Sequence, residues 1–222
     1  MCGLAGIYSH KPVATELYDS LIHLQHRGQD AAGITTYNKH MHKTKGMGLV
    51  RDIFTEKKIK RLKGNIGIAH TRYPTHGGFG HGEIQPFWTS VPYGIALAHN
   101  GNLTNYNELA NNITNKESRY LNTNSDTEVL LHLFAELLHY KNKHENDKQF
   151  FDCLCSALEN IYKNVQGAYS VVALVIGKGL VAFRDPQGIR PLVKGVRQNS
   201  NGKQDYIIAS ENTMFYPLGF KP

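Results

Sequence analysis

The spacing of apolar residues predicts one helix and one strand near the start of the chain. Residues 3–8 (GLAGIY) form an apolar run that is typical of a buried strand. After Pro12, apolar residues recur at helical intervals: Val13, Leu17, Leu21 and Leu24. We therefore expect an amphipathic helix over residues 12–26 that ends near Gly28.

Strand-like runs dominate the rest of the pattern. They cover residues 31–37, 45–50, 67–71 and 94–98. In the last third, AYSVVALVIG and LVAFRD flank the turn at 177–179, and PLVKGVR and DYIIAS flank an Asn-Gly turn at 201–202. The segment HGGFGHG at 76–82 has the composition of a mobile loop.

Two longer helices are expected in the middle of the chain. Ser125 begins the sequence SDTE, in which Ser125 and Glu128 fit a capping box at a helix N-terminus. A second helix is predicted over residues 147–164. Strands joined by tight turns pair antiparallel, so we expect the α+β class, with antiparallel sheets and helices packed outside them.

Composition and charge narrow the function classes. The chain has 222 residues, enough for one large domain, and no apolar run long enough to span a bilayer. Its opening is too short and uncharged for a secretory signal, so we expect a cytoplasmic protein without a membrane partner. The net charge of +7 comes from scattered cations, with a cluster at 57–63 that fits the wet face of a short helix. We therefore expect no nucleic-acid partner.

Cysteine and histidine content gives little support to a metal site or a disulfide framework. The three cysteines are an odd number, and Cys153 and Cys155 lie on an apolar helical pattern where thiols act as small hydrophobic groups. Twelve histidines produce close pairs by chance, as at His23 and His26. Because no thiol pair completes a set of four ligands, we expect no metal.

Cys2 is the candidate nucleophile. A thiol attacks as its thiolate, and no histidine neighbours Cys2 in the sequence. If Met1 is removed, the freed α-amine has a reference pKa of roughly 7.7–8.0 and can accept the thiol proton, directly or through water. This arrangement needs no other base.

The sequence AHNGNLTN offers donors for an oxyanion. The side-chain amide of Asn100 and the backbone N–H of Gly101 follow an apolar strand, and glycine lets the backbone approach a substrate closely. The alternative is a plain hairpin turn at Asn100-Gly101.

Arg72 and Asp126 suit a substrate that carries both a carboxylate and an ammonium group. The planar guanidinium of Arg72 can bind a carboxylate, and Asp126, at a helix start, can take the ammonium. Each has a simpler alternative: Arg72 as a surface ion-pair partner, and Asp126 as a first-turn residue favoured by the helix dipole.

An ordered set of motifs resembles the class II glutamine amidotransferase family. The motifs are CGLAG at the start, HRGQDAAG at 26–33, HTRYPT at 70–75, QPF at 85–87, HNGNLTN at 99–105 and SDTE at 125–128. The resemblance implies an N-terminal nucleophile (Ntn) hydrolase fold, a four-layer αββα sandwich of two antiparallel sheets between helices. Within the class, QHRGQDAAGI, HTRYPT and RDPQGIRPLV most resemble the amidophosphoribosyltransferases, which use glutamine nitrogen to begin purine synthesis from phosphoribosyl pyrophosphate.

The resemblance implies a role for each motif residue. Cys2 would form a γ-glutamyl thioester, and Asn100 and Gly101 would form the oxyanion hole. Arg72 and Asp126 would bind the α-carboxylate and α-ammonium of L-glutamine. Two further residues, Thr75 and His76, would lie near the carboxylate, and Arg27 and Asp30 would support the site.

The resemblance also sets expectations for domains, cofactors and partners. Residues 1–222 correspond to the glutaminase domain alone, so the ammonia acceptor would be a phosphoribosyltransferase domain or another chain. No cofactor is expected in this domain, and Mg²⁺ would accompany phosphoribosyl pyrophosphate in the other. Some family members also carry an iron–sulfur cluster, whose cysteines would lie beyond residue 222. The oligomeric state, a homo-oligomer included, is left open.

Two departures and three alternatives accompany this interpretation. The residues after RYPT read HGGFGH, where the family usually has a small residue and serines, and the tail after Ser210-Glu211 also differs. The alternatives are a glutaminase that serves a sugar phosphate or aspartate, another Ntn amide hydrolase, and a truncated module that binds glutamine without catalysis.

Overall fold

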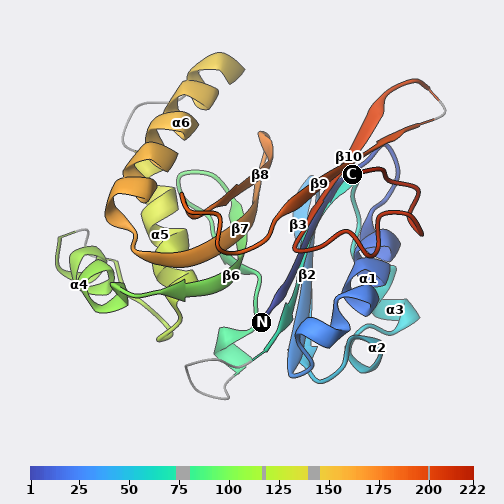
Figure 1. Cartoon of the computed structure of the whole chain (residues 1–222), viewed down its shortest axis with the longest axis horizontal. Coiled ribbons are helices and arrows are strands. Elements are labelled where there is room, and N and C mark those ends of the chain that lie inside the picture. The colour runs from blue at the N-terminus through green and yellow to red at the C-terminus, as the bar shows by residue number, and fades with distance from the viewer. Residues whose placement is uncertain (74–80, 117–118, 140–145, 200) are drawn as a thin grey trace.

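Two antiparallel sheets lie face to face between helices in the computed structural model of the chain (Figure 1). The structure describes residues 1–73, 81–116, 119–139, 146–199 and 201–222. In this part of the chain one sheet has the strand order β3-β2-β4-β1-β10-β9 and the other β5-β6-β7-β8. The expected α+β class and the αββα layering are confirmed.

Some neighbouring strands are joined by short hairpins, such as β2 and β3, and others are far apart in the sequence, such as β1 and β10. The first sheet contains β1 (Gly3–Tyr8), β2 (Ala31–Asn38), β3 (His40–Met47), β4 (Ile66–Arg72), β9 (Val193–Gln198) and β10 (Gln204–Ala209). The second contains β5 (Phe87–Thr89), β6 (Ile95–Leu103), β7 (Gly167–Val175) and β8 (Gly179–Arg184). All neighbouring strands in both sheets run antiparallel.

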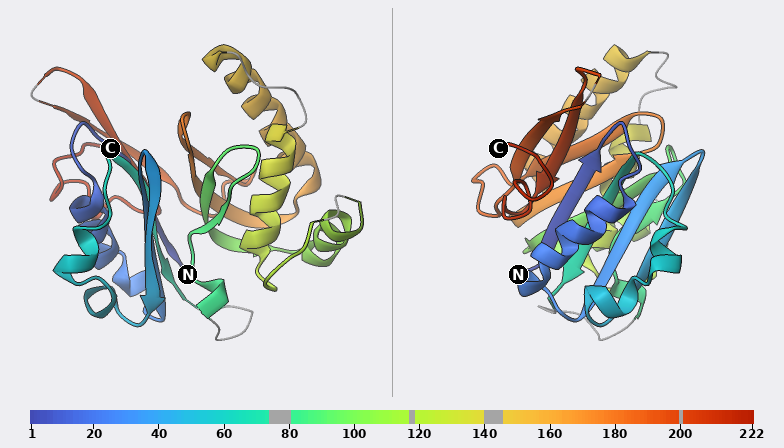
Figure 2. Two further views of the ribbon diagram at one scale, coloured as in Figure 1. Left: turned by 180° about the vertical axis from the view of Figure 1, so that it is seen from behind. Right: turned by 90° about the vertical axis from the view of Figure 1, so that its right-hand side faces the viewer.

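Helices cover the outer face of each sheet (Figure 2). Those on the first sheet are α1 (Ala14–His23), α2 (Val50–Ile53) and α3 (Glu56–Ile59), and those on the second are α4 (Tyr106–Lys116), α5 (Asp126–His139) and α6 (Asp147–Asn164). Two single turns, η1 (Gln25–Arg27) and η2 (His81–Glu83), lie between elements. No helix of the described ranges is long and apolar enough to cross a membrane.

The N-terminal strand β1 occupies the interior of its sheet. It pairs with β4 on one side and β10 on the other, and the N–H of Leu4 also donates to Ser210 Oγ at 3.0 Å. Small residues make this placement possible: a Cβ on Gly6 would lie 2.6 Å from Val172 Cγ1 of the opposite sheet. The first residues of the chain are therefore held in a fixed position.

Two successive layers of side chains fill the space between the sheets. Ile68, Ala98 and Val172 belong to the cluster that joins both sheets, and they form what we term the apolar layer. Because side chains alternate along a strand, the positions two residues nearer to Cys2 face the same space. They are the buried residues His70, Asn100 and Ser170, here termed the polar layer.

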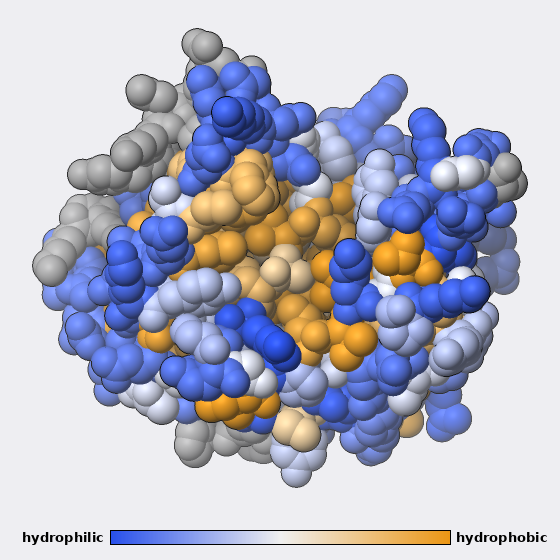
Figure 3. Space-filling view, turned by 45° about the horizontal axis from the view of Figure 1, so that its top comes forward, coloured by the Kyte–Doolittle hydropathy of each residue, from blue (hydrophilic) through white to orange (hydrophobic). Residues whose placement is uncertain are grey.

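At the opposite end, away from the N-terminus, the sheets diverge and apolar side chains gather in a hollow (Figure 3). Partly buried apolar residues that pack against the central cluster from β8, β10 and the segment before β9 include Leu180, Ile208 and Leu192. The sandwich is thus apolar at its open end and polar at the end that holds Cys2.

Two predicted elements differ from the structure. The strand expected at 45–50 has the wrong bounds. Strand β3 covers His40–Met47, because a tight turn at Lys39 starts its pairing with β2 earlier in the sequence. Gly48 then adopts a φ of +107° and Val50 begins α2. The first helix is shorter than predicted, since α1 ends at His23 and η1 follows. Helix α6, by contrast, has the predicted bounds.

The capping box at α5 is only half formed. Ser125 Oγ accepts from the N–H of Thr127 at 3.3 Å, but the Glu128 carboxylate accepts from the N–H groups of Asn122 and Thr123 at 3.0 and 2.7 Å. Burial opposes ionisation of Glu128, yet these bonds and His132 lower its pKa to about 2. The preceding loop thus folds back over the helix start and fixes its direction.

Candidate active site

A cavity of about 500 Å³ opens at the Cys2 end of the sandwich. Four of the predicted residues line it: Cys2 before β1, Arg72 at the end of β4, Gly101 in β6 and Asp126 at the start of α5. These elements are far apart in the sequence and meet only because both sheets end here.

The other three predicted site residues are Asn100, Thr75 and His76. Asn100 sits one position before Gly101, with its side chain in the adjoining polar layer. Thr75 and His76 fall outside the described residues, as does most of the loop predicted at 76–82. Their predicted contacts with a carboxylate therefore stay predictions.

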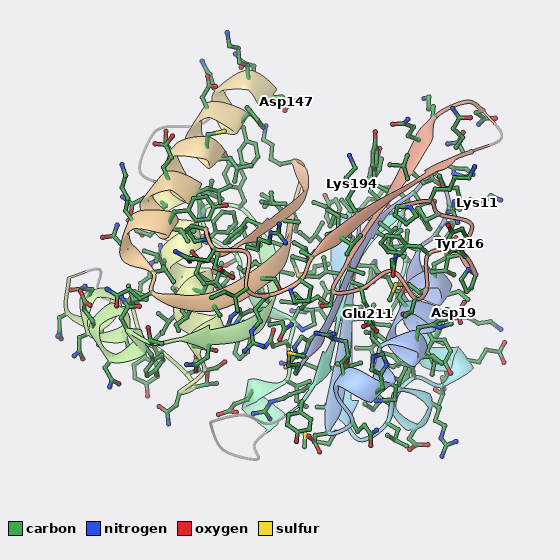
Figure 4. The ribbon with its side chains drawn as sticks, in the orientation of Figure 1. Lys11, Asp19, Asp147, Lys194, Glu211 and Tyr216 are labelled. Carbon is green, nitrogen blue, oxygen red and sulfur yellow. The ribbon has the colours of Figure 1, made fainter. Side chains whose placement is uncertain are left out.

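Cys2 is held from two sides. Its Sγ lies 3.8 Å from the carbonyl oxygen of Tyr73, and its own carbonyl oxygen accepts from Arg27 Nε at 3.0 Å. Arg27 in turn contacts Glu211, which lies in the segment after β10 (Figure 4), with 3.4 Å between Nη1 and Oε2. Burial raises the pKa of the Cys2 thiol, and the nearby Arg72 charge opposes this shift. The thiol therefore needs a base before it can react at neutral pH.

Arg72 forms an ion pair that the sequence did not indicate. Its Nη2 donates to the carboxylate of Glu83, from η2, and both side chains are largely buried. The carbonyl oxygen of Arg72 accepts from the N–H of Asp30 at 3.2 Å, so the HRGQD motif also supports this strand end. The simple alternative of a surface ion pair is wrong, because Arg72 is only 7% exposed and faces the cavity.

Asp126 presents a carboxylate to the cavity at the N-terminus of α5. Its Oδ2 accepts from the N–H of Leu103 at 3.2 Å, and its Oδ1 lies 3.5 Å from Nδ1 of His99. Although burial acts in the opposite direction, His99 and the backbone N–H groups of Leu103 and Thr127 lower the pKa of Asp126. The group is therefore ionised at neutral pH.

His99 is a buried neighbour of the site that the sequence analysis did not select. Its backbone N–H donates to Gln85 Oε1 at 2.6 Å, and its Nδ1 lies 3.3 Å from Thr127 Oγ1. Gln85 Nε2 also donates to Thr127 Oγ1, at 3.0 Å. The sequence motifs that could have indicated this hydrogen-bond network are QPF and HNG, because their first residues are Gln85 and His99.

Asn100 and Gly101 lie inside a strand and not in a hairpin turn. They pair with Ser170 and Tyr169 of β7, in the middle of a nine-residue strand, so the turn alternative is wrong. A Cβ on Gly101 would lie 2.0 Å from the carbonyl oxygen of Ala168, which excludes any larger residue. Asn100 Nδ2 is buried and has no hydrogen-bond partner in the described part of the chain.

The cavity thus combines a thiol, a cation and an anion. Cys2 is close enough to both Arg72 and Asp126 for their charges to act on its pKa, in opposite directions. Such a pair of fixed charges suits a zwitterion, such as a free amino acid. In the described ranges, no group of three or more His, Cys, Asp or Glu side chains is arranged to hold a metal ion.

Comparisons with known proteins agree with this geometry. A family model described as a glutamine amidotransferase domain matches residues 78–217. The amidophosphoribosyltransferases of Pasteurella multocida and Saccharomyces cerevisiae are each 47% identical to this chain, over 223 and 226 residues. The alignments cover 100% and 99% of this chain but 44% of each relative, so the chain spans less than half the length of these relatives.

Solved structures show the same relationship. Glutamine phosphoribosylpyrophosphate amidotransferase from B. subtilis, determined with ADP and GMP, is 31% identical and superposes with a TM-score of 0.79. The match covers 99% of this chain and 44% of that one. A predicted glutamine amidotransferase from Pseudomonas aeruginosa, 16% identical with a TM-score of 0.59 over 95% of this chain, shares the fold.

Proposed function

The chain belongs to the glutamine amidotransferase family, and from that premise we propose that it releases ammonia from the carboxamide of L-glutamine with Cys2 as the nucleophile. The observation that carries the proposal is one cavity lined together by Cys2, Arg72 and Asp126. Glutamine has the matching groups, since its carboxylate and ammonium lie at one end and its carboxamide at the other.

Substrate binding uses the two fixed charges. Arg72 binds the α-carboxylate and Asp126 the α-ammonium, with Thr75 and His76 near the carboxylate. Because Glu83 already contacts Arg72, the substrate carboxylate either shares the guanidinium with Glu83 or displaces it. The Glu83 carboxylate thus competes with the α-carboxylate of glutamine for the Arg72 guanidinium.

The reaction proceeds through a thioester. After removal of Met1, the α-amine of Cys2 takes the thiol proton, and the thiolate attacks the carboxamide carbon. Collapse of the tetrahedral intermediate breaks the C–N bond, and the amine returns the proton to the leaving ammonia. Water then attacks the γ-glutamyl thioester, which releases glutamate and restores the thiol.

Asn100 and Gly101 stabilise the oxyanion of both tetrahedral intermediates. The donors are Asn100 Nδ2 and the Gly101 N–H. The absence of a partner for Asn100 Nδ2 among the described residues leaves this donor available, and the lack of a side chain at Gly101 lets the backbone pack against Ala168.

We propose that the ammonia serves amidophosphoribosyl transfer in a longer cytoplasmic protein. The names of the relatives and the RDPQGIRPLV motif support this acceptor over a sugar phosphate or aspartate. The phosphoribosyltransferase unit would bind phosphoribosyl pyrophosphate with Mg²⁺, and the glutaminase unit needs no cofactor for the chemistry above. In that arrangement the two units act in sequence on one nitrogen atom.

The test is an intact mass of the purified chain, before and after exposure to an electrophilic glutamine analogue, together with a glutaminase assay. We expect loss of Met1, a single adduct on Cys2, and no hydrolysis by Cys2→Ala. Cys153→Ala, which removes a thiol from α6, is the matched control and retains both adduct and activity. Hydrolysis that survives Cys2→Ala would refute the mechanism, and glutamine binding without hydrolysis by the processed chain would favour a binding module.

A further inference from the structure

The polar layer includes Asn100, one of the two residues of the proposed oxyanion hole. Asn100 and Ser170 are cross-strand partners on β6 and β7, and both face the space between the sheets. His70 of β4 faces the same space from the other sheet, where its ring is close to the backbone of His99. The three side chains therefore face the same space between the sheets, two from one sheet and one from the other.

These three side chains are polar, yet all of them are buried. His70 and Ser170 are 0% exposed and Asn100 is 2% exposed. Asn100 Nδ2 and Ser170 Oγ make no hydrogen bond within the described ranges, and His70 has no side-chain partner there: only the backbone of His99 lies within hydrogen-bonding reach of its ring. Buried polar groups in native proteins are nearly always satisfied, by protein or by ordered water.

The three groups are complementary to a single water molecule. Burial, with the charges of His99 and Arg72, lowers the pKa of His70 to about 3, so its imidazole is neutral and one ring nitrogen accepts a hydrogen bond. Ser170 Oγ both donates and accepts, and Asn100 Nδ2 donates. A water that donates to His70 and Ser170 and accepts from Asn100 would satisfy an atom of each residue.

We propose that one ordered water molecule is bound between the sheets by His70, Asn100 and Ser170, and that it positions the Asn100 amide for the oxyanion. The second part rests on the proposed glutaminase function. The amide nitrogen of Asn100 carries two N–H bonds, of which the water accepts one. The other is then fixed in direction toward the cavity, where a negative charge develops on the carboxamide oxygen. His70 and Ser170 are positioning residues in this scheme, since they act through the water.

The water itself is tested without any assay of activity. A high-resolution crystal structure of the processed wild-type chain is expected to show one peak of solvent density within hydrogen-bond distance of all three residues. ¹⁵N chemical shifts of His70 are expected to report a neutral ring from pH 5 to pH 8. A dry contact among the three side chains, or a protonated ring in this range, would overturn the proposal.

The positioning role is tested by kinetics with Ser170→Ala, His70→Gln and His70→Phe. We expect Ser170→Ala and His70→Phe to lower kcat for glutamine about tenfold, less than the 10²–10³ typical of losing an oxyanion donor outright, with KM unchanged. His70→Gln keeps a hydrogen-bonding group and is expected to recover part of the loss. Alkylation of Cys2 by iodoacetamide needs no oxyanion hole and is expected to keep its wild-type rate.

The control separates this effect from general damage to the core. Ser20 is a buried serine of α1 that donates to the Glu16 carbonyl oxygen far from the polar layer, and Ser20→Ala is expected to keep the wild-type kcat. A wild-type kcat in Ser170→Ala would refute the positioning role, as would equal losses in Ser170→Ala and Ser20→Ala. Activity in Cys2→Ala would instead refute the glutaminase mechanism and leave the bound water intact.

Discussion

The apolar and polar layers occupy neighbouring positions on the same three strands, yet the side chains of one are all apolar and those of the other are all polar. Ile68, Ala98 and Val172 pack together without a polar side-chain atom. Two positions nearer to Cys2, His70, Asn100 and Ser170 bury polar atoms that have no side-chain partner in the described part of the chain. The comparison teaches that apolar packing and buried polar groups occupy successive layers of one interface.

Close packing and unsatisfied polarity have opposite energetic effects. The apolar layer gains free energy from area removed from water and from dense contacts. The polar layer costs free energy wherever a donor or acceptor is left without a partner. A substitution in the first layer should therefore change stability, and one in the second should change catalysis.

The largest effect is expected from Asn100→Ala in the polar layer. Loss of an oxyanion donor typically lowers kcat by about 10²–10³, while the free energy of unfolding in urea should fall less than in Ile68→Ala, because Asn100 Nδ2 makes no hydrogen bond to another described residue. Asn105→Ala is the matched control: it removes the bond from Nδ2 to the Asn164 carbonyl oxygen, outside the site, and should keep kcat. A strong loss of stability in Asn100→Ala would contradict the division between the layers.

Ile68→Ala is the converse change in the apolar layer. Truncation of a fully buried isoleucine leaves a cavity between the sheets, so we expect the free energy of unfolding to fall by about 3 kcal/mol. Urea unfolding at neutral pH measures this loss. The glutaminase kcat, measured well below the melting temperature, should stay within about twofold of wild type, and a tenfold loss would show that the layers are coupled.

The pH dependence of stability should include a contribution from His70. In the folded chain its pKa is lowered to about 3, whereas the unfolded side chain has its ordinary value near 6.5. Between these values the unfolded state binds the extra proton, so stability should fall by up to ~1.4 kcal/mol per pH unit as the pH drops below 6.5. Urea unfolding from pH 7 to pH 5 measures the slope. His70→Gln should reduce it, and the exposed His23→Gln should not.

The smallest effect is expected from Glu83→Gln, outside both layers. Removal of the charge that competes for Arg72 should lower the KM for glutamine about threefold to tenfold, with kcat unchanged. Asp126→Asn is the matched control, because it removes the other fixed charge and should raise KM. A raised KM in Glu83→Gln would mean that Glu83 orients Arg72 for the substrate.

Four residues that the sequence analysis selected, Cys2, Arg72, Gly101 and Asp126, do line one cavity, and their roles in catalysis stay predictions. The bounds of one strand were predicted less well. The strand expected at 45–50 was misplaced, because its position depends on where the β2–β3 hairpin turns, and the sequence analysis did not use Asn38, next to Lys39, as a signal for that turn.

Contacts between distant segments could not be predicted. Locally, Asn100-Gly101 has the composition of a turn, but pairing with nine residues of β7 keeps it extended. The ion pair between Arg72 and Glu83 depends on how the chain returns after β4, and the polar layer depends on which strands face each other. Residue types alone do not specify either arrangement.

The interior position of β1 also determines when the nucleophile is locked in place during synthesis. Its partner β10 begins at Gln204, about two hundred residues after β1 itself. At translation rates of roughly 5–20 residues per second, the start of the chain waits about 10–40 s for that partner to emerge. Met1 thus leaves the ribosome on a strand whose sheet is still open. The removal of Met1 proposed above would then precede closure of the fold.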